Sequence, residues 1–196
     1  MSQYNLTFDI PIDLIYQQGI LPQRNQKNLF YQTTSCRSNL SRFTLSSENR
    51  RILNKTISFT YQTIDLTQFT YTSDIQKQIF GWIKSLGWDF PAASVKTIFT
   101  NHIFNKLTLW QENNQTIGYA ISLDYPDFTH IAYVFYPDTY LHTNLPSRMV
   151  LQAIIDSHDQ GKKYCYLGQF SKDSGYYKRN MPGFEYYNNG SWTTTL

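Results

Sequence analysis

Basic side chains gather in one stretch of the sequence, between Arg24 and Lys55. The stretch holds seven Lys or Arg residues against one acidic residue, Glu48, so its net charge is +6, whereas the whole 196-residue chain carries +3 and the remainder sums to −3. Guanidinium and ammonium groups bind phosphate and carboxylate groups, and this asymmetry is typical of a phosphate-binding face. A solvated basic face without a partner would have the same composition. The basic residues are Arg24, Lys27, Arg37, Arg42, Arg50, Arg51 and Lys55.

The remaining reactive side chains form no recognisable catalytic or metal-binding pattern. Cys36 and Cys165 are far apart and give no disulfide framework, so we expect a reduced, cytoplasmic setting. The four histidines lack the spacing of metal ligands, and we find no Walker loop, Gly-x-Ser-x-Gly motif or Cys/His dyad. No apolar run approaches the ~20 residues that cross a bilayer, and the first residues lack the pattern of a secretory signal. The histidines are His102, His130, His142 and His158.

The first half of the chain predicts short elements. Ser46 precedes a basic helix as a candidate N-cap, residues 57–65 alternate with the period of a strand, and apolar residues at helical spacing after Ser73 predict a helix that ends at Gly87. The other predicted elements are a short helix at 13–18, a strand at 28–33 and a helix at 92–100.

The second half predicts an antiparallel meander followed by a strand–helix–strand unit. A helix over 146–158 begins near Pro146, and the strand after it can pair in parallel with the last strand of the meander through a right-handed crossover. This order is that of the GNAT acyltransferase core, although other α+β sheets share it. The strands are predicted at 106–111, 116–124, 130–136 and 164–170, with a final hairpin around 188–190.

Several segments, in their order and spacing, resemble the arginyl-tRNA–protein transferase family, which includes bacterial aspartate/glutamate leucyltransferases and eukaryotic arginyltransferases. Segment 124–138 (DYPDFTHIAYVFYPD) is similar to the family's strand–turn–strand with its aromatic pair and terminal Pro and Asp. Segments 164–168 (YCYLG) and 175–178 (GYYK) with Phe184 are similar to motifs farther along. The likeness covers most of the chain after Arg24. Upstream, the matching residues are Tyr31, Cys36, Arg37, Arg42, Phe43, Ser46, Arg50 and Arg51.

The resemblance implies an α+β, GNAT-like fold with a mixed, mostly antiparallel sheet flanked by helices. It implies a shortened N-terminal basic module over residues 1–65 and an aminoacyltransferase core over 66–196. The family's N-terminal module has a Cys-x-x-Cys pair, but here Thr33 stands where the partner of Cys36 would be. An iron–sulfur cluster needs about four ligands, so we predict no cluster and no other cofactor. The trimmed module puts the acceptor specificity in doubt more than the fold.

The resemblance further implies transfer of Arg or Leu from a charged tRNA to the N-terminal α-amine of an acceptor protein. An ester is already activated, so neither ATP nor a metal is required. Asp124 is predicted to orient or deprotonate the amine, Tyr133 to donate to the oxyanion, and Gln169 to hydrogen-bond around the ester. The alternative for Asp124 is a carboxylate that caps a turn, and that for Tyr133 is a core tyrosine. The alternative for Gln169 is an edge residue whose side chain hydrogen-bonds the backbone.

Two groups of basic residues are predicted to bind the substrates. Lys178 and Arg179 would meet the tRNA 3′ end or an acidic acceptor side chain, and the alternative is a solvated pair. A second group would contact phosphates of the acceptor stem or an acceptor Asp or Glu. The second group comprises Arg37, Arg42, Arg50 and Arg51.

Two rival functions stay open at this point. An acetyl-CoA-dependent N-acetyltransferase usually needs a Gly-rich loop before the main helix, and residues 142–147 (HTNLPS) contain no glycine. The second rival is a non-catalytic module that binds tRNA or N-terminal peptides. We expect a monomer with no membrane partner.

Overall fold

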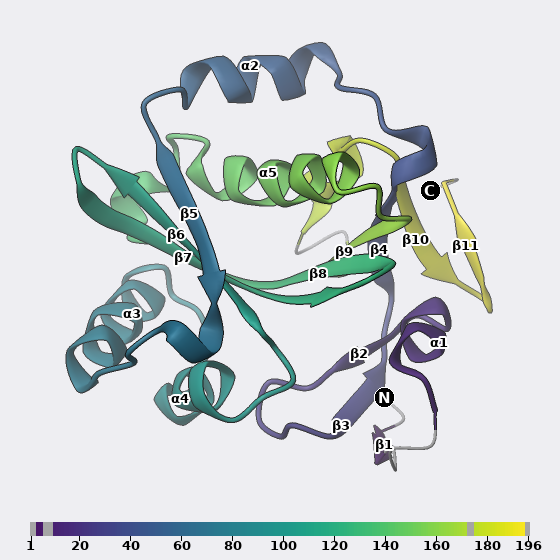
Figure 1. The fold of residues 1–196 in the computed structure, drawn as a ribbon, viewed down its shortest axis with the longest axis horizontal. Helices are drawn as coiled ribbons and strands as arrows, with labels where there is room; N and C mark the ends of the chain where they lie inside the picture. The colour runs from purple at the N-terminus through teal and green to yellow at the C-terminus, as the bar shows by residue number, and fades with distance from the viewer. Residues whose placement is uncertain (1–2, 6–9, 172–174, 195–196) are drawn as a thin grey trace.

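An eight-stranded sheet forms the centre of the protein (Figure 1). The computed structural model describes residues 3–5, 10–171 and 175–194. The strand order is β11-β10-β4-β9-β8-β7-β6-β5. β8 and β9 run parallel and all other neighbours antiparallel, which confirms the predicted α+β class. The strands are β4 (Ser35–Asn39), β5 (Thr60–Asp65), β6 (Lys106–Glu112), β7 (Gln115–Tyr125), β8 (Phe128–Phe135), β9 (Tyr164–Gln169), β10 (Phe184–Asn188) and β11 (Ser191–Thr193).

The second half of the chain folds as its pattern predicts. β6, β7 and β8 form the meander, and Asn113 and Asn114 both adopt positive φ in the tight turn between β6 and β7, as such hairpins require. α5 (Leu145–Asp159) then crosses back, and β9 pairs in parallel with β8. This half carries the sheet positions around which the candidate site is built.

The first half differs more from its prediction. The predicted strand 57–65 begins at Thr60, because the chain after α2 (Ser47–Lys55) makes a turn in which the Phe59 amide bonds the Thr56 carbonyl at 3.1 Å. A second sheet of three short strands, in the order β1-β3-β2, lies beside α1 (Ile12–Gln17). β1, β2 and β4 are three to five residues long, too short for a periodic signal. The small sheet comprises β1 (Gln3–Asn5), β2 (Ile20–Pro22) and β3 (Leu29–Gln32).

Helices cover both faces of the main sheet (Figure 1). α5, with α2 above it, packs on one face, where Met149 and Ile154 join a buried cluster with Ile131 of β8. α3 (Ser73–Ser85) and α4 (Ala92–Thr100) pack on the other, where Ile79 and Ile98 join a second buried cluster. The short 3₁₀ helices are η1 (Leu40–Arg42), η2 (Leu66–Gln68), η3 (Asp138–Tyr140) and η4 (Tyr176–Asn180).

The N-cap of α2 is the one that the sequence predicts. The Ser46 hydroxyl accepts a hydrogen bond from the Asn49 amide at 3.1 Å, and the Asn49 side chain accepts one from the Ser46 amide at 3.0 Å. This reciprocal capping box fixes where the basic helix begins, and therefore where Arg50 and Arg51 lie.

The predicted N-terminal module shares the main sheet with the predicted core. β4 and β5 come from residues 1–65, yet β4 pairs with β9 and β10, and β5 pairs with β6. The division at residue 65 stays a prediction. Within the described residues, no helix has both the length and the apolar character that crossing a membrane requires.

Candidate active site

The two parallel strands of the sheet, β8 and β9, separate half-way along their length. β8 and β9 are paired at Phe128↔Tyr164, Thr129↔Cys165 and His130↔Tyr166. Beyond His130, β8 continues on β7 as far as Phe135, whereas the end of β9 continues on β4. The carboxyl ends of two adjacent parallel strands are thus free of each other, and such places in open sheets are common ligand sites.

A bulge lies in each strand at the level where they separate. In β8, Ile131 pairs with Ser122 and Tyr133 pairs with Ile121, so Ala132 is an extra residue. In β9, Gly168 pairs with Cys36 of β4 and Tyr166 pairs with the next residue of β4, Arg37, so Leu167 is an extra residue. Bulges bend a strand and leave one residue outside the ladder. Two of them side by side explain why β8 and β9 diverge here.

Asp124 lies near the end of β7 on the face that α5 covers. It lines a cavity of about 340 Å³ together with Ala153 and Asp156 of α5. Its carboxylate forms an ion pair with Lys162, whose side chain is 6% exposed, and accepts a hydrogen bond from the Thr129 hydroxyl at 3.3 Å. The carboxylate is therefore the counter-ion of a buried lysine.

Tyr133 lies on the opposite face, because the bulge at Ala132 turns it toward α3 and α4. Its ring packs against Phe90 and Phe104 with centroids 5.7 and 5.6 Å apart. Burial raises the pKa of its hydroxyl, so Tyr133 stays protonated and able to donate. The structure does not bring Tyr133 and Asp124 together, since the sheet separates them.

Gln169 is the last residue of β9, and its side chain is exposed. Its carbonyl accepts a hydrogen bond from Lys178 Nζ at 2.8 Å. This contact places η4 against the free end of β9. The roles assigned to Asp124, Tyr133 and Gln169 from the sequence stay predictions.

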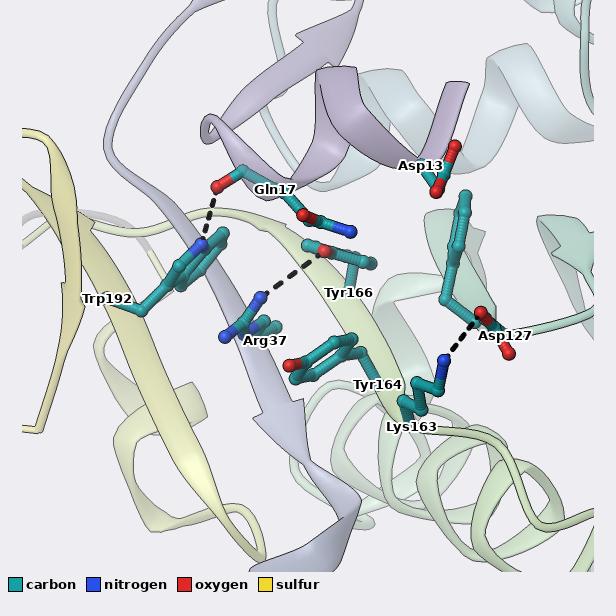
Figure 2. Close-up of a pocket in the computed structure, with 9 residues that line it drawn as sticks. Asp13, Gln17, Arg37, Asp127, Lys163, Tyr164, Tyr166 and Trp192 are labelled. Atoms are coloured by element: carbon teal, nitrogen blue, oxygen red, sulfur yellow. Dashed lines mark hydrogen bonds and ion pairs between the residues drawn. The ribbon is translucent and has the colours of Figure 1, made fainter. Parts of the chain in front are cut away.

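Arg37 is enclosed by aromatic rings and a carboxylate (Figure 2), and its role in substrate binding stays a prediction. It is 6% exposed, its guanidinium lies 3.7 Å from the ring centre of Tyr164 and 4.0 Å from that of Trp192, and its Nε donates to Glu185 at 2.8 Å. Figure 2 shows it at one wall of a cavity of about 350 Å³ below α1. Arg42 forms an ion pair with the same Glu185 carboxylate. These contacts cross-link β4, η1 and β10.

Arg50 and Arg51 are exposed at the start of α2. The side-chain Nδ2 of Asn49 donates to the Asn180 carbonyl at 3.1 Å, which brings the end of η4 to α2. Arg51 pairs with Glu48 and lies 3.5 Å from Asn144, the residue before α5. α2 therefore contacts η4 through Asn49 and the residue before α5 through Arg51. α2 carries the basic residues Arg50 and Arg51, and η4 carries Lys178 and Arg179.

Sequence reasoning missed a buried polar pair at the parting point. His130 is the last residue of β8 that is paired with β9, and it is 3% exposed. Its Nδ1 lies 2.8 Å from the hydroxyl of Tyr16, which is fully buried on α1. The available signal was a histidine within an apolar strand, but a core histidine gives the same signal.

Comparisons with known proteins identify the fold. No family model matches the chain, and no curated protein matches it. The C-terminal domain, of the class DUF2156, of a protein described as a lysylphosphatidylglycerol synthetase from Agrobacterium fabrum matches with a TM-score of 0.52 and 11% identity, over 70% of this chain and 46% of that one. The L-PGS of Bacillus licheniformis matches with a TM-score of 0.51 and 10% identity, over 76% and 51%.

A GCN5-related glucosamine N-acetyltransferase region of a fungal multi-domain enzyme also matches, with a TM-score of 0.49 and 11% identity, over 79% of this chain and 19% of that one. The present chain spans about half the length of the first two structures. The predicted α+β fold is confirmed, with its mixed, mostly antiparallel sheet and flanking helices, and the first two structures share it. At these identities the likeness concerns the fold.

Arg37→Met tests the structural role of the enclosed guanidinium. The substitution removes the buried partner of Glu185 and leaves this carboxylate to the half-exposed Arg42, so the free energy of unfolding should fall by about 2 kcal/mol, the cost of a lost charged hydrogen bond. Chemical denaturation measures this loss. Arg51→Met is the control, because the exposed Arg51–Glu48 pair should leave the unfolding midpoint unchanged. Equal effects of the two substitutions would contradict the structural assignment of Arg37.

Proposed function

We propose that this protein is an acyltransferase that uses aminoacyl-tRNA and moves Arg or Leu to the N-terminal α-amine of an acceptor protein. One observation carries the proposal. α2 carries Arg50 and Arg51 and η4 carries Lys178 and Arg179; a hydrogen bond from the Asn49 side chain to Asn180 joins the two elements, and Lys178 bonds the end of β9. A phosphate backbone bound there would place its 3′-terminal ester at the parted strands.

The fold supports acyl transfer as the chemistry. One of its structural neighbours is described as a lysylphosphatidylglycerol synthetase, a name for an enzyme whose product carries an amino acid esterified to a lipid. The segment before α5 in this chain has no glycine, and Asn144 takes the positive φ of 67° at the helix start. Arg51 approaches that residue, which suits a nucleic-acid phosphate.

The reaction requires no cofactor. The acceptor amine, with a pKa of about 8, loses a proton and its nitrogen attacks the ester carbon. The attacking nitrogen gives up a second proton, the tetrahedral intermediate collapses, the carbon–oxygen ester bond breaks, and the ribose oxygen of the tRNA leaves with that proton. Tyr133 is proposed to donate to the intermediate and Gln169 to orient the ester. Asp124 lies across the sheet from Tyr133 and pairs with Lys162, so this geometry does not support its predicted role at the amine.

An aminoacyl-transfer assay tests this function directly. We expect labelled Arg or Leu to pass from its tRNA to a peptide with N-terminal Asp or Glu, and a peptide with an acetylated N-terminus to receive none. Binding of tRNA without transfer from any charged tRNA would instead identify a binding module. Stabilisation by CoA in a thermal-shift experiment, without transfer, would identify an acetyltransferase.

Tyr133→Phe and Gln169→Ala should each slow transfer, the first by about 100-fold because it removes a donor to the intermediate, whereas Asp124→Asn should leave the rate of the folded protein unchanged. Single-turnover rates measure the chemical step. The Asp124 variant also removes the counter-ion of Lys162, so its unfolding curve must be recorded alongside. A variant that folds and transfers at the wild-type rate removes that residue from the mechanism.

Arg50→Gln with Arg51→Gln should weaken tRNA binding and reduce the slope of log affinity against log salt concentration by about two, one per lost phosphate contact. Filter binding over a salt series measures both quantities. Lys96→Gln is the matched control, because Lys96 is exposed on α4 at the opposite face of the sheet. An unchanged slope in the double variant would place the tRNA elsewhere.

A further inference from the structure

A polar cavity lies between the C-terminal half of α5 and the sheet face that α5 covers (Figure 1). Its volume is about 340 Å³, and small-molecule sites commonly measure ~300–1,000 Å³. A smaller cavity of about 20 Å³ shares four lining residues with it, which are Thr108, Ser122, Ala153 and Asp156. A sheet face under a helix is usually apolar, so the oxygen atoms of this lining require an explanation.

Asp156 of α5 has one carboxylate oxygen without a partner. Its Oδ1 accepts hydrogen bonds from the Tyr61 hydroxyl at 3.0 Å and from Gln152 Nε2 at 2.7 Å. Its Oδ2 accepts no hydrogen bond from the described residues, yet it is not sealed from solvent. Since Asp156 lines both cavities, a group bound there can reach Oδ2.

Ser122 of β7 provides a second free oxygen. The residue is 9% exposed and lines both cavities. It pairs with Ile131 of β8, which packs in the same buried cluster as Met149 of α5, so the two strands present these residues to the helix. The Ser122 hydroxyl has no hydrogen bond to the described part of the chain, and it too is open to solvent. Such a nearly buried, unpartnered hydroxyl is a candidate for contact with a ligand.

The charges around the cavity leave Asp156 without a counter-ion. Lys106 pairs with Asp65 at 2.7 Å, and Lys162 pairs with Asp124. Three carboxylates therefore stand against two ammonium groups. The remaining negative charge is that of Asp156, which forms no ion pair within the described ranges. A cation is the ligand charge that this balance favours.

The other charges that act on Asp156 do not change this balance. Burial raises the pKa of its carboxyl group, and the nearby charge of Asp159 raises it further. The charge of Arg148 opposes this rise, but Arg148 lies two helical turns earlier on α5, roughly 12 Å along the axis, and lines neither cavity. A cation bound at Oδ2 would supply the close opposite charge that the carboxylate lacks.

The single free oxygen of Asp156 favours a primary ammonium group over a guanidinium group. A guanidinium pairs best when both carboxylate oxygens accept its fork of N–H groups, and Oδ1 already accepts two bonds. An ammonium nitrogen has three N–H donors for separate acceptors such as Oδ2 and the Ser122 hydroxyl. The ring of Tyr61, stacked on Trp110 with centroids 5.0 Å apart and still 37% exposed, adds an aromatic wall that attracts a cation.

We propose that this cavity is a second ligand site, which binds a small molecule through its primary ammonium group. The ammonium nitrogen donates to Asp156 Oδ2 and to the Ser122 hydroxyl, and the hydroxyl-lined part of the cavity at Thr63 and Thr129 receives the polar remainder of the ligand. The site is separate from the one proposed for acyl transfer, because the cavity lies on the α5 face of the sheet and Tyr133 lies on the other.

A titration with linear aminobutanol, followed by ¹H–¹⁵N NMR, tests the site. We expect the backbone amide resonances of Ser122 and Asp156 to shift with a saturable dependence on the amine concentration. Linear butanediol has a hydroxyl in place of the ammonium, so it should bind at least about tenfold more weakly, the loss of one charge-assisted hydrogen bond. Failure of the amine to bind, or equal binding of the diol, would overturn the proposal.

Asp156→Asn should weaken aminobutanol binding at least about tenfold, because it removes the charge and keeps the shape of the side chain. Asp159→Asn is the matched control. It removes the same charge from the same helix, but the Asp159 side chain is 69% exposed and lines neither cavity, so solvent screening should limit its effect to less than about threefold. Equal losses in the two variants would show a long-range attraction and sink the site.

Ser122→Ala separates a ligand contact from a structural role. The variant loses a hydroxyl that has no partner in the described part of the chain, so its unfolding midpoint should stay the same or rise. Its affinity for aminobutanol should fall by about three- to tenfold. A lower unfolding midpoint with unchanged affinity would assign the hydroxyl to the fold and contradict the site.

Two further readouts test the ligand class. Linear guanidinobutanol should bind more weakly than aminobutanol, and tighter binding of the guanidinium would rule out the choice of a primary ammonium. In ¹³C spectra, the pKa of the Asp156 carboxyl group should fall when aminobutanol is bound, because the cation favours the ionised form; an unchanged pKa would place the amine elsewhere. None of these measurements requires tRNA, so failure of the transfer assay would leave this site standing, and failure here would leave the proposed function standing.

Discussion

The separation of β8 from β9 after His130 is the constraint on which the rest of the site depends. A parallel pair that stayed in register to its end would fill the ladder and leave no backbone groups or side chains free between the strands. The adjacent bulges at Ala132 and Leu167 prevent this. Beyond this point β8 stays paired with β7, and β9 stays paired with β4, so the sheet remains continuous on both sides of the opening.

The same constraint determines how the site must be held from outside. The ends of β8 and β9 do not hydrogen-bond to each other. They are held instead by packing on both faces of the sheet and by hydrogen bonds from η4. Lys178 fastens η4 to the end of β9, and Asn49 fastens it to α2. The Arg37–Glu185 ion pair joins β4 to β10 behind them. A network that combines buried charge with loop contacts can position donors more rigidly than an isolated loop could.

Local patterns predicted the elements that bury one face, and failed where tertiary contacts decide the role of a residue. The meander, α5 and the cap at Ser46 follow from alternation, helical spacing and capping chemistry that lie within a few residues of one another. By contrast, the pairing of Asp124 with Lys162 spans 38 positions, and that of Tyr16 with His130 spans 114. The bulge at Ala132 also shifts Tyr133 to the other face, which strict alternation cannot foresee.

The contact between Tyr16 and His130 bears on how much the N-terminal segment matters. Tyr16 belongs to α1, outside the main sheet, yet its ring packs against Phe128 and Tyr166 at the paired ends of β8 and β9, with centroids 4.7 and 4.9 Å away. It thereby covers the closed half of the strand pair while its hydroxyl reaches the residue at which the strands open. α1 therefore packs one buried aromatic ring against the paired ends of both strands, and its position contributes to where β8 and β9 separate.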